Sequence, residues 1–167
     1  MKHFSDPFFA MSRRVEDLYL SLGSNIGNRE EALEEARHTL SEEIGTISNA
    51  SDVIETPPWG KTDQAAFLNQ VVVIPTDIRP SVLLDAILHM EEELGRVRFE
   101  KWGPRRIDID IILYGSIVYQ SDLLEIPHPY MHERRFVLEP LAQLAPDLVH
   151  PVLNRTIKQL LSELPDA

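Results

Sequence analysis

Two aspartates that alternate with isoleucines are the first candidates for chemistry: Asp108 and Asp110, in the stretch 107–112. Alternate residues of a strand share a face, so both carboxylates point the same way, roughly 6.6 Å apart along the chain. Carboxylates at this spacing can hold one or two Mg²⁺ ions together with water and substrate phosphates. The alternative is the solvated face of an edge strand, although aspartate is disfavoured in strands and two on one face repel each other.

A cluster of cations lies directly before these carboxylates. Its members are Arg96, Arg98, Lys101, Arg105 and Arg106, opposed within 96–106 only by Glu100, which gives a local net charge of five minus one, or +4. The planar fork of arginine donates two hydrogen bonds to a phosphate at once. Cations for phosphates beside carboxylates for a metal are what Mg-nucleotide chemistry requires, with surface ion pairs to glutamates as the alternative. No GxxxxGK[ST] or GxGxxG loop is present, which excludes a P-loop or Rossmann phosphate cradle.

A third candidate is His128, which stands between Pro127 and Pro129. Proline on each side keeps the backbone stiff and extended, which would fix the position of a functional imidazole. An ordinary loop histidine is the alternative. The sequence offers no Ser/His/Asp arrangement for nucleophilic catalysis.

Composition narrows the class of protein. A length of 167 residues fits one domain, and 43% hydrophobic with 26% charged residues is ordinary for a globular protein. The net charge of −11 argues against nucleic acid or an anionic membrane as a partner. There is no cysteine, which excludes thiolate nucleophiles, disulfides and Cys-ligated metals. The chain also lacks an apolar run long enough to span a membrane and a typical signal peptide, so we expect a cytoplasmic protein.

Periodicity predicts the elements that must position the candidate residues. Strands are expected over 18–22, 46–55, 67–74 and 107–114, and helices over 28–45, 80–94, 138–144 and 156–164. Gly23 is read as the start of the turn after the first strand, Asn28 as a helix cap and Pro80 as the first residue of a helix. This order predicts an α+β, ferredoxin-like β-α-β-β-α-β core with additional C-terminal helices and long catalytic loops. Residues 1–16 are expected to form an N-terminal extension and 17–167 a single catalytic domain.

Together, these residues resemble the 6-hydroxymethyl-7,8-dihydropterin pyrophosphokinase (HPPK) family of folate biosynthesis. The resemblance rests above all on 101–112 and 18–27, with supporting blocks at 55–60, 67–69, 95–98 and 126–129. It implies an HPPK-like, Mg-dependent transferase that moves the β,γ-pyrophosphoryl group of ATP to the hydroxymethyl group of 6-hydroxymethyl-7,8-dihydropterin, giving AMP and the pterin diphosphate. The alternatives are another Mg-dependent phosphotransferase with a small planar substrate, and a binding or regulatory module with a vestigial nucleotide site.

The resemblance also implies which residues form the site. Asp108 and Asp110 would bind two Mg²⁺ ions and, with Arg98 and Arg105, would be catalytic. The implied ATP-binding set is Glu91, Arg96, Arg98, Trp102, Arg105, Ile111, His128 and Arg134. The implied pterin-binding set is Thr56, Pro57, Trp59, Phe67, Asn69 and Phe136, with core packing as the alternative for its aromatic members. The expected partners are these small molecules alone, bound by a monomer, with a partner enzyme of the same pathway left open.

Overall fold

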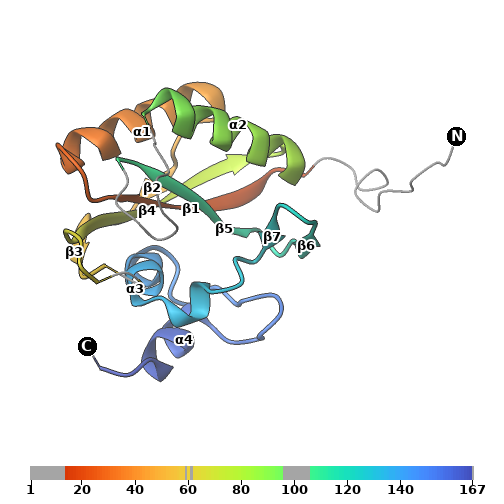
Figure 1. The fold of residues 1–167 in the computed structure, drawn as a ribbon. Coiled ribbons are helices and arrows are strands. Elements are labelled where there is room, and N and C mark those ends of the chain that lie inside the picture. The colour runs from red at the N-terminus through yellow and green to blue at the C-terminus, as the bar shows by residue number, and fades with distance from the viewer. Residues whose placement is uncertain (1–13, 59, 61, 96–105, 167) are drawn as a thin grey trace, which may run out of the picture.

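The structure, a computed structural model, describes residues 14–58, 60, 62–95 and 106–166, and its fold is α+β (Figure 1). The main sheet contains β1 (Glu16–Ser24), β2 (Asn49–Ala50), β3 (Ile54–Thr56), β4 (Phe67–Thr76) and β5 (Asp108–Tyr114). Its order is β2-β4-β1-β5, β3 also pairs with β4, and every pairing is antiparallel. The predicted Trp59, Arg96, Arg98, Trp102 and Arg105 lie outside the described residues.

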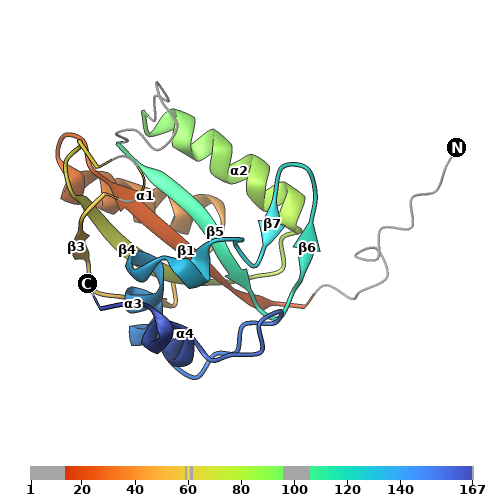
Figure 2. The ribbon, with the colours of Figure 1, turned by 60° about the horizontal axis from the view of Figure 1, so that its bottom comes forward.

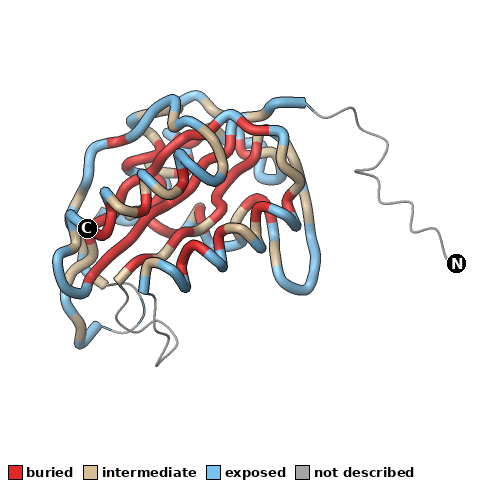
Figure 3. Tube along the Cα trace, turned by 90° about the horizontal axis from the view of Figure 1, so that it is seen from above, coloured by how far each residue is buried: buried red, intermediate tan, exposed pale blue. Residues whose placement is uncertain are grey.

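Helices cover both faces of this sheet. Figures 1 and 2 show α1 (Arg29–Glu43) and α2 (Pro80–Glu93) on one face and α3 (Arg135–Leu144) and α4 (Ile157–Glu163) on the other. Each pair of helices seals its own hydrophobic cluster against the strands. Buried residues accordingly follow the strands and the inner sides of the helices (Figure 3). Within the described part of the chain, no helix has the length and apolar character that crossing a membrane requires.

Several predicted element ends are confirmed. The Asn28 side chain accepts a hydrogen bond from the backbone N–H of Glu31 at 3.1 Å and so caps α1. Pro80 is the first residue of α2, where its missing N–H leaves no intrahelical bond unmade. Gly95 follows α2 with a φ of +84°, a conformation that favours glycine.

Other predicted boundaries were wrong. β1 continues through Ser24, so Gly23 is a strand residue and does not begin a turn. The single strand expected over 46–55 is interrupted between β2 and β3. Ser51 lies at this break, and its hydroxyl accepts a hydrogen bond from the backbone N–H of Val71 on β4. α3 begins at Arg135, one turn before the expected start. The short hairpin of β6 (Tyr119–Gln120) and β7 (Glu125–Ile126), beside β5 in Figure 2, was not predicted.

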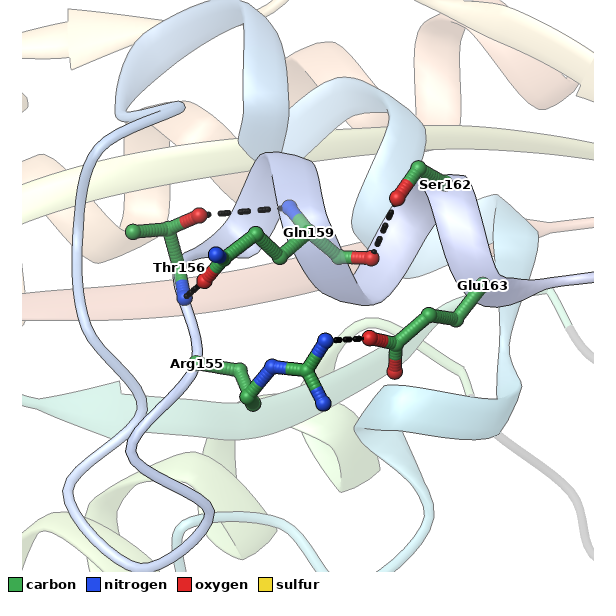
Figure 4. A network of polar contacts seen from close by, with 5 residues as sticks. All are labelled: Arg155, Thr156, Gln159, Ser162 and Glu163. Atoms are coloured by element: carbon green, nitrogen blue, oxygen red, sulfur yellow. Dashed lines mark hydrogen bonds and ion pairs between the residues drawn. The ribbon is translucent and has the colours of Figure 1, made fainter.

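α4 is held by polar contacts at its first turn (Figure 4). Thr156 Oγ1 accepts from the N–H of Gln159 at 3.2 Å, and Gln159 Oε1 accepts from the N–H of Thr156 at 2.8 Å. Arg155 also forms an ion pair with Glu163. These contacts fix the helix that packs against α3, the element that carries Phe136.

Candidate active site

The two aspartates lie on one face of β5, as their alternation predicts. Ile109 and Ile111 are buried in the cluster under α1 and α2, and Asp108 and Asp110 alternate with them. Asp108 and Asp110 are both partly exposed and lie on the other face of the sheet. Further along β5, α3 covers that face. The pairing of β5 with β1 shifts at Ile112, the extra residue of a bulge that ends the strict alternation.

A row of paired strand residues runs from Asp108 across the sheet. Asp108 on β5 is opposite Gly23 on β1, and Gly23 is opposite Asn69 on β4. The neighbouring row pairs Asp110 with Ser21. Because paired residues point to the same face of a sheet, the predicted metal and pterin residues share one surface, with a glycine between them.

Three of the predicted pterin residues lie together at the Asn69 end of this row. Asn69 is buried, and its Nδ2 donates to Thr56 Oγ1 at 2.5 Å. Phe67, two residues earlier on β4, belongs to the same face and is half-buried. Pro57 follows Thr56 and is exposed. The amide, hydroxyl and ring form a surface that a flat heterocycle with polar edges could contact.

Two residues that the sequence did not single out fasten the chain before Phe67. Asn25 Nδ2 donates to Gln64 Oε1 at 2.9 Å and to the carbonyl of Ala65 at 3.1 Å. Arg29 donates to the carbonyl of Ala66 at 2.9 Å and forms a 2.8 Å ion pair with Glu55 on β3. Both side chains therefore position Thr56 and Phe67 without being predicted to touch a ligand.

A second group joins the aspartates to Phe136. The backbone N–H of His128 donates to the carbonyl of Ile112 at 2.9 Å, which places the histidine beside β5. Arg134 is only 5% exposed, and its guanidinium carbon lies 5.6 Å from the ring centroids of both Tyr130 and Phe136. The arrangement holds a positive charge between the predicted pterin residue Phe136 and Tyr130, whose ring centroid lies 6.1 Å from that of the predicted nucleotide residue His128. Tyr130 was missed, because only this contact distinguishes it from any exposed loop tyrosine.

The imidazole of His128 is neutral at ordinary pH. Burial, followed by the positive charge of Arg134, lowers its pKa from 6.5 to about 4, against a smaller opposing effect of Asp108. Its Nδ1 accepts from the backbone N–H of Tyr130 at 3.1 Å. With Nδ1 accepting, the neutral ring carries its proton on Nε2, so it can donate a hydrogen bond there but adds no charge to the site.

This pKa predicts a loss of stability in acid. Between pH 6.5 and about pH 4 the unfolded chain binds a proton at His128 that the folded chain does not. The free energy of unfolding of the metal-free protein should therefore fall as the pH is lowered through this range, by at most about 3 kcal/mol from this residue. Urea unfolding of His128→Gln should show a shallower dependence of stability on pH than wild type. Equal pH dependence in the two proteins would contradict the assignment.

Three residues of the predicted clusters face away from this surface or serve another contact. The side chain of Ile111 is buried among α1 and α2, on the opposite face of β5 from Asp110, so only its backbone remains for a nucleotide. Glu91 is buried on α2, in the helical layer of that opposite face. Arg106, read above as part of the phosphate cluster, donates to the carbonyl of Leu94 and to Glu35, both at 2.7 Å. It thus fastens the start of β5 to the two helices.

The donor set of Asp108 and Asp110 fits Mg²⁺. Among the described residues, no group of three or more His, Cys, Asp or Glu side chains comes together as a complete metal site. Two partly exposed carboxylates leave most ligand positions to water and phosphate oxygens, which is how Mg²⁺ is bound in nucleotide enzymes.

Known proteins resemble this chain over most of its length. A protein of Methylorubrum extorquens named 2-amino-4-hydroxy-6-hydroxymethyldihydropteridine pyrophosphokinase is 44% identical over 148 residues, which are 87% of this chain and 92% of that one. The Bacillus subtilis protein of the same name is 45% identical over 127 residues, 75% of this chain and 76% of its own. The folic acid synthesis protein fol1 of Schizosaccharomyces pombe is 44% identical over 148 residues, 88% of this chain but only 20% of that longer protein.

Solved structures show the same fold in a larger protein. The crystal structure of wild-type Plasmodium falciparum HPPK-DHPS superposes with a TM-score of 0.73 at 20% identity, covering 92% of this chain and 45% of that one. The family model described as 7,8-dihydro-6-hydroxymethylpterin-pyrophosphokinase (HPPK) matches residues 19–146, which is more than half of the chain and includes the row from Asp108 to Asn69. The chain therefore belongs to the HPPK family.

Proposed function

We propose that this protein transfers the β,γ-pyrophosphoryl group of ATP to the hydroxymethyl group of 6-hydroxymethyl-7,8-dihydropterin, giving AMP and the pterin diphosphate of folate biosynthesis. The observation that carries the proposal is the paired row of Asp108, Gly23 and Asn69. The row brings Asp108 and Asn69 to one sheet face in a chain of this family, where the carboxylate would meet the reacting end of the substrate and the amide its ring edge. The strand order supports a ferredoxin-like description of the scaffold.

The pterin would bind at the Asn69 end of the row. Asn69, already oriented by Thr56, would read the polar edge of the ring, and Phe67 and Phe136 would stack on its faces. The guanidinium of the buried Arg134 lies 5.6 Å from the centroid of the Phe136 ring, and its charge also lowers the pKa of His128. Trp59 and Pro57 remain predicted wall residues.

The nucleotide would bind on the His128 side of Asp108 and Asp110. Neutral His128 and charged Arg134 supply a hydrogen bond and a cation there, and Arg98 and Arg105 remain the predicted clamps for the transferred phosphates. Phosphoryl transfer depends mainly on positioning and on electrostatic stabilisation of phosphate oxygens. Arg96, Trp102 and the backbone of Ile111 complete the proposed ATP set. Glu91, buried on α2 in the helical layer of the opposite sheet face, remains a predicted member.

Asp108 and Asp110 would hold two Mg²⁺ ions between the two substrates. When bound, Mg²⁺ supplies charge neutralisation for the phosphates and a lowered pKa for the pterin hydroxyl. Asp108, in register with Gly23 and Asn69, would be the carboxylate that assists removal of the hydroxyl proton. Its strand position fixes the backbone of Asp108 two strands away from that of Asn69.

The reaction is tested by its nucleotide product. With Mg-ATP and 6-hydroxymethyl-7,8-dihydropterin, the protein should release AMP in equal amount to pterin diphosphate, and it should release little without the pterin. Chromatography of the nucleotides separates this result from the alternatives. ADP as the product would indicate an ordinary kinase, and binding of both ligands without turnover would indicate a vestigial site. Cytoplasmic location, monomeric state and docking of a pathway enzyme remain predictions.

A further inference from the structure

Arg106, two residues before Asp108, is held on the helical side of the main sheet. Its Nη2 donates to Glu35 on α1 and its Nη1 donates to the carbonyl of Leu94 after α2, both at 2.7 Å. A Cβ added at Gly95 would lie 3.7 Å from Arg106 Cδ, so the stem of the arginine runs beside this turn. Both terminal nitrogens of the guanidinium therefore serve the scaffold, in a residue that the proposed reaction does not use.

The contact with Leu94 completes the end of α2. The last carbonyls of a helix have no intrahelical partners and carry partial negative charge, which a cation stabilises. α2 ends in Met90-Glu91-Glu92-Glu93, so its last turn contains no cation of its own. Arg106 supplies one from another element, and Glu35 pairs with it from α1. The start of β5 is thereby tied to both helices at one point.

Asp108 depends on this contact more than Asp110 does. β5 is the last strand in the order of the main sheet, where it pairs with β1. That pairing begins at Asp108, opposite Gly23, whereas Asp110 lies two positions further in. The ends of a ladder open more readily than its interior. On the other side of Asp108 the chain is held by the contacts of Arg106 and by the fully buried side chain of Ile107.

We propose that Arg106 is a positioning residue for the reaction. Together with Glu35 and the end of α2, it holds the backbone at the start of β5 and so keeps Asp108, the proposed metal ligand, opposite Gly23. This inference rests on the proposed function and adds a residue that acts on the carboxylate from the opposite side of the sheet. Arg106 acts through the backbone of β5 and not through contact with a substrate.

The test is Arg106→Met, which removes the charge and both hydrogen bonds but keeps an unbranched stem beside Gly95. The kcat for AMP release should fall by about tenfold, because even a small displacement of a catalytic group is costly. Affinity for 6-hydroxymethylpterin should stay at the wild-type value, because the ring contacts lie two strands away. Calorimetry with Mg²⁺ and α,β-methylene-ATP, which cannot be cleaved at the reacting bond, measures this affinity.

Hydrogen exchange of the metal-free protein tests the same inference without turnover. In Arg106→Met the backbone amides of 107–109 should exchange severalfold faster than in wild type, and those of 111–113 should keep their wild-type rates. Adding Glu35→Gln to Arg106→Met should lower kcat no further, because the two side chains share one contact. Arg155→Met is the matched control: it breaks the ion pair with Glu163 on α4 and should leave kcat and exchange at wild-type values.

Each contrary outcome overturns the inference. Wild-type kcat in Arg106→Met would show that Asp108 is held without this contact. Faster exchange throughout 107–113, with a lower thermal midpoint, would show that Arg106 stabilises the whole sheet and positions no particular residue. A loss of pterin affinity that accounts for the loss of rate would place its effect at the ring pocket. In all these cases wild-type protein would still form AMP, whereas a wild-type protein that forms none would refute the proposed function itself.

Discussion

Replacing Asp110 with asparagine is expected to reduce AMP formation by about three orders of magnitude, because the loss of a metal carboxylate removes several kcal/mol of transition-state stabilisation. The amide has the same shape as the carboxylate but no charge, so its carbonyl oxygen binds Mg²⁺ much more weakly. In this variant Asp108 would be the one member of the pair that still carries a carboxylate on this face of β5. The measurement is kcat for AMP release at saturating Mg-ATP and pterin.

The same variant should keep its fold. Asp110 is partly exposed, and β5 is held to β1 by its backbone ladder and by Ile109 and Ile111. Without metal, Asp110→Asn should unfold at the same temperature as wild type or slightly higher, because Asp108 loses a like-charged neighbour. Mg²⁺ with α,β-methylene-ATP should raise the thermal midpoint of wild type and raise that of the variant much less.

The exposed carboxylate of Asp122, in the β6–β7 connection, provides a matched control. Asp122→Asn removes one negative charge from an exposed connection outside the main sheet and should behave as wild type in both assays. Wild-type turnover in Asp110→Asn would refute the metal assignment. Equal loss in both variants would show that the net charge, and no particular ligand, is responsible.

The sequence predicts those features of the fold that depend on residues close together in the chain. The alternation of Asp108 and Asp110 with isoleucines fixes which face of β5 they occupy, because the period of a strand is two. Asn28 and Pro80 mark helix starts through contacts within a few residues. The bulge at Ile112 has no such signal, because it depends on the register between β5 and β1.

Residues whose roles depend on distant partners were predicted poorly. Arg106 belongs by sequence to the cationic cluster, yet its ion pair is with Glu35, 71 positions away. Gly23 follows an apolar run, where a turn and a continuing strand give the same local pattern. Only its pairing with both Asn69 and Asp108 shows that it lies within the site. The sequence therefore predicted a set of site residues, and only the sheet shows which of the described ones share a face.

Arg134→Met is expected to weaken binding of α,β-methylene-ATP by about tenfold to a hundredfold, because hydrogen bonds from a charged donor contribute about 1.5–3 kcal/mol. AMP formation at subsaturating ATP should fall at least as far. Methionine retains an unbranched apolar stem between Tyr130 and Phe136, so the packing of the two rings is preserved while the charge is lost. The free energy of unfolding should change little, since removing a buried charge also removes the cost of keeping it out of water.

The pKa of His128 distinguishes an electrostatic role of Arg134 from a purely structural one. The charge of Arg134 is the second cause of the low pKa of His128, about 4, so the pKa should rise in Arg134→Met and stay below 6.5 because burial remains. Titration of the imidazole signals by NMR measures it directly. Arg135→Met is the matched control, because the neighbouring Arg135 donates to the carbonyl of Pro165 and contacts neither ring. If ATP affinity is unchanged in Arg134→Met while the His128 pKa rises, Arg134 tunes the histidine but does not bind the nucleotide. If both are unchanged, the cation between the two rings has no electrostatic role in the site.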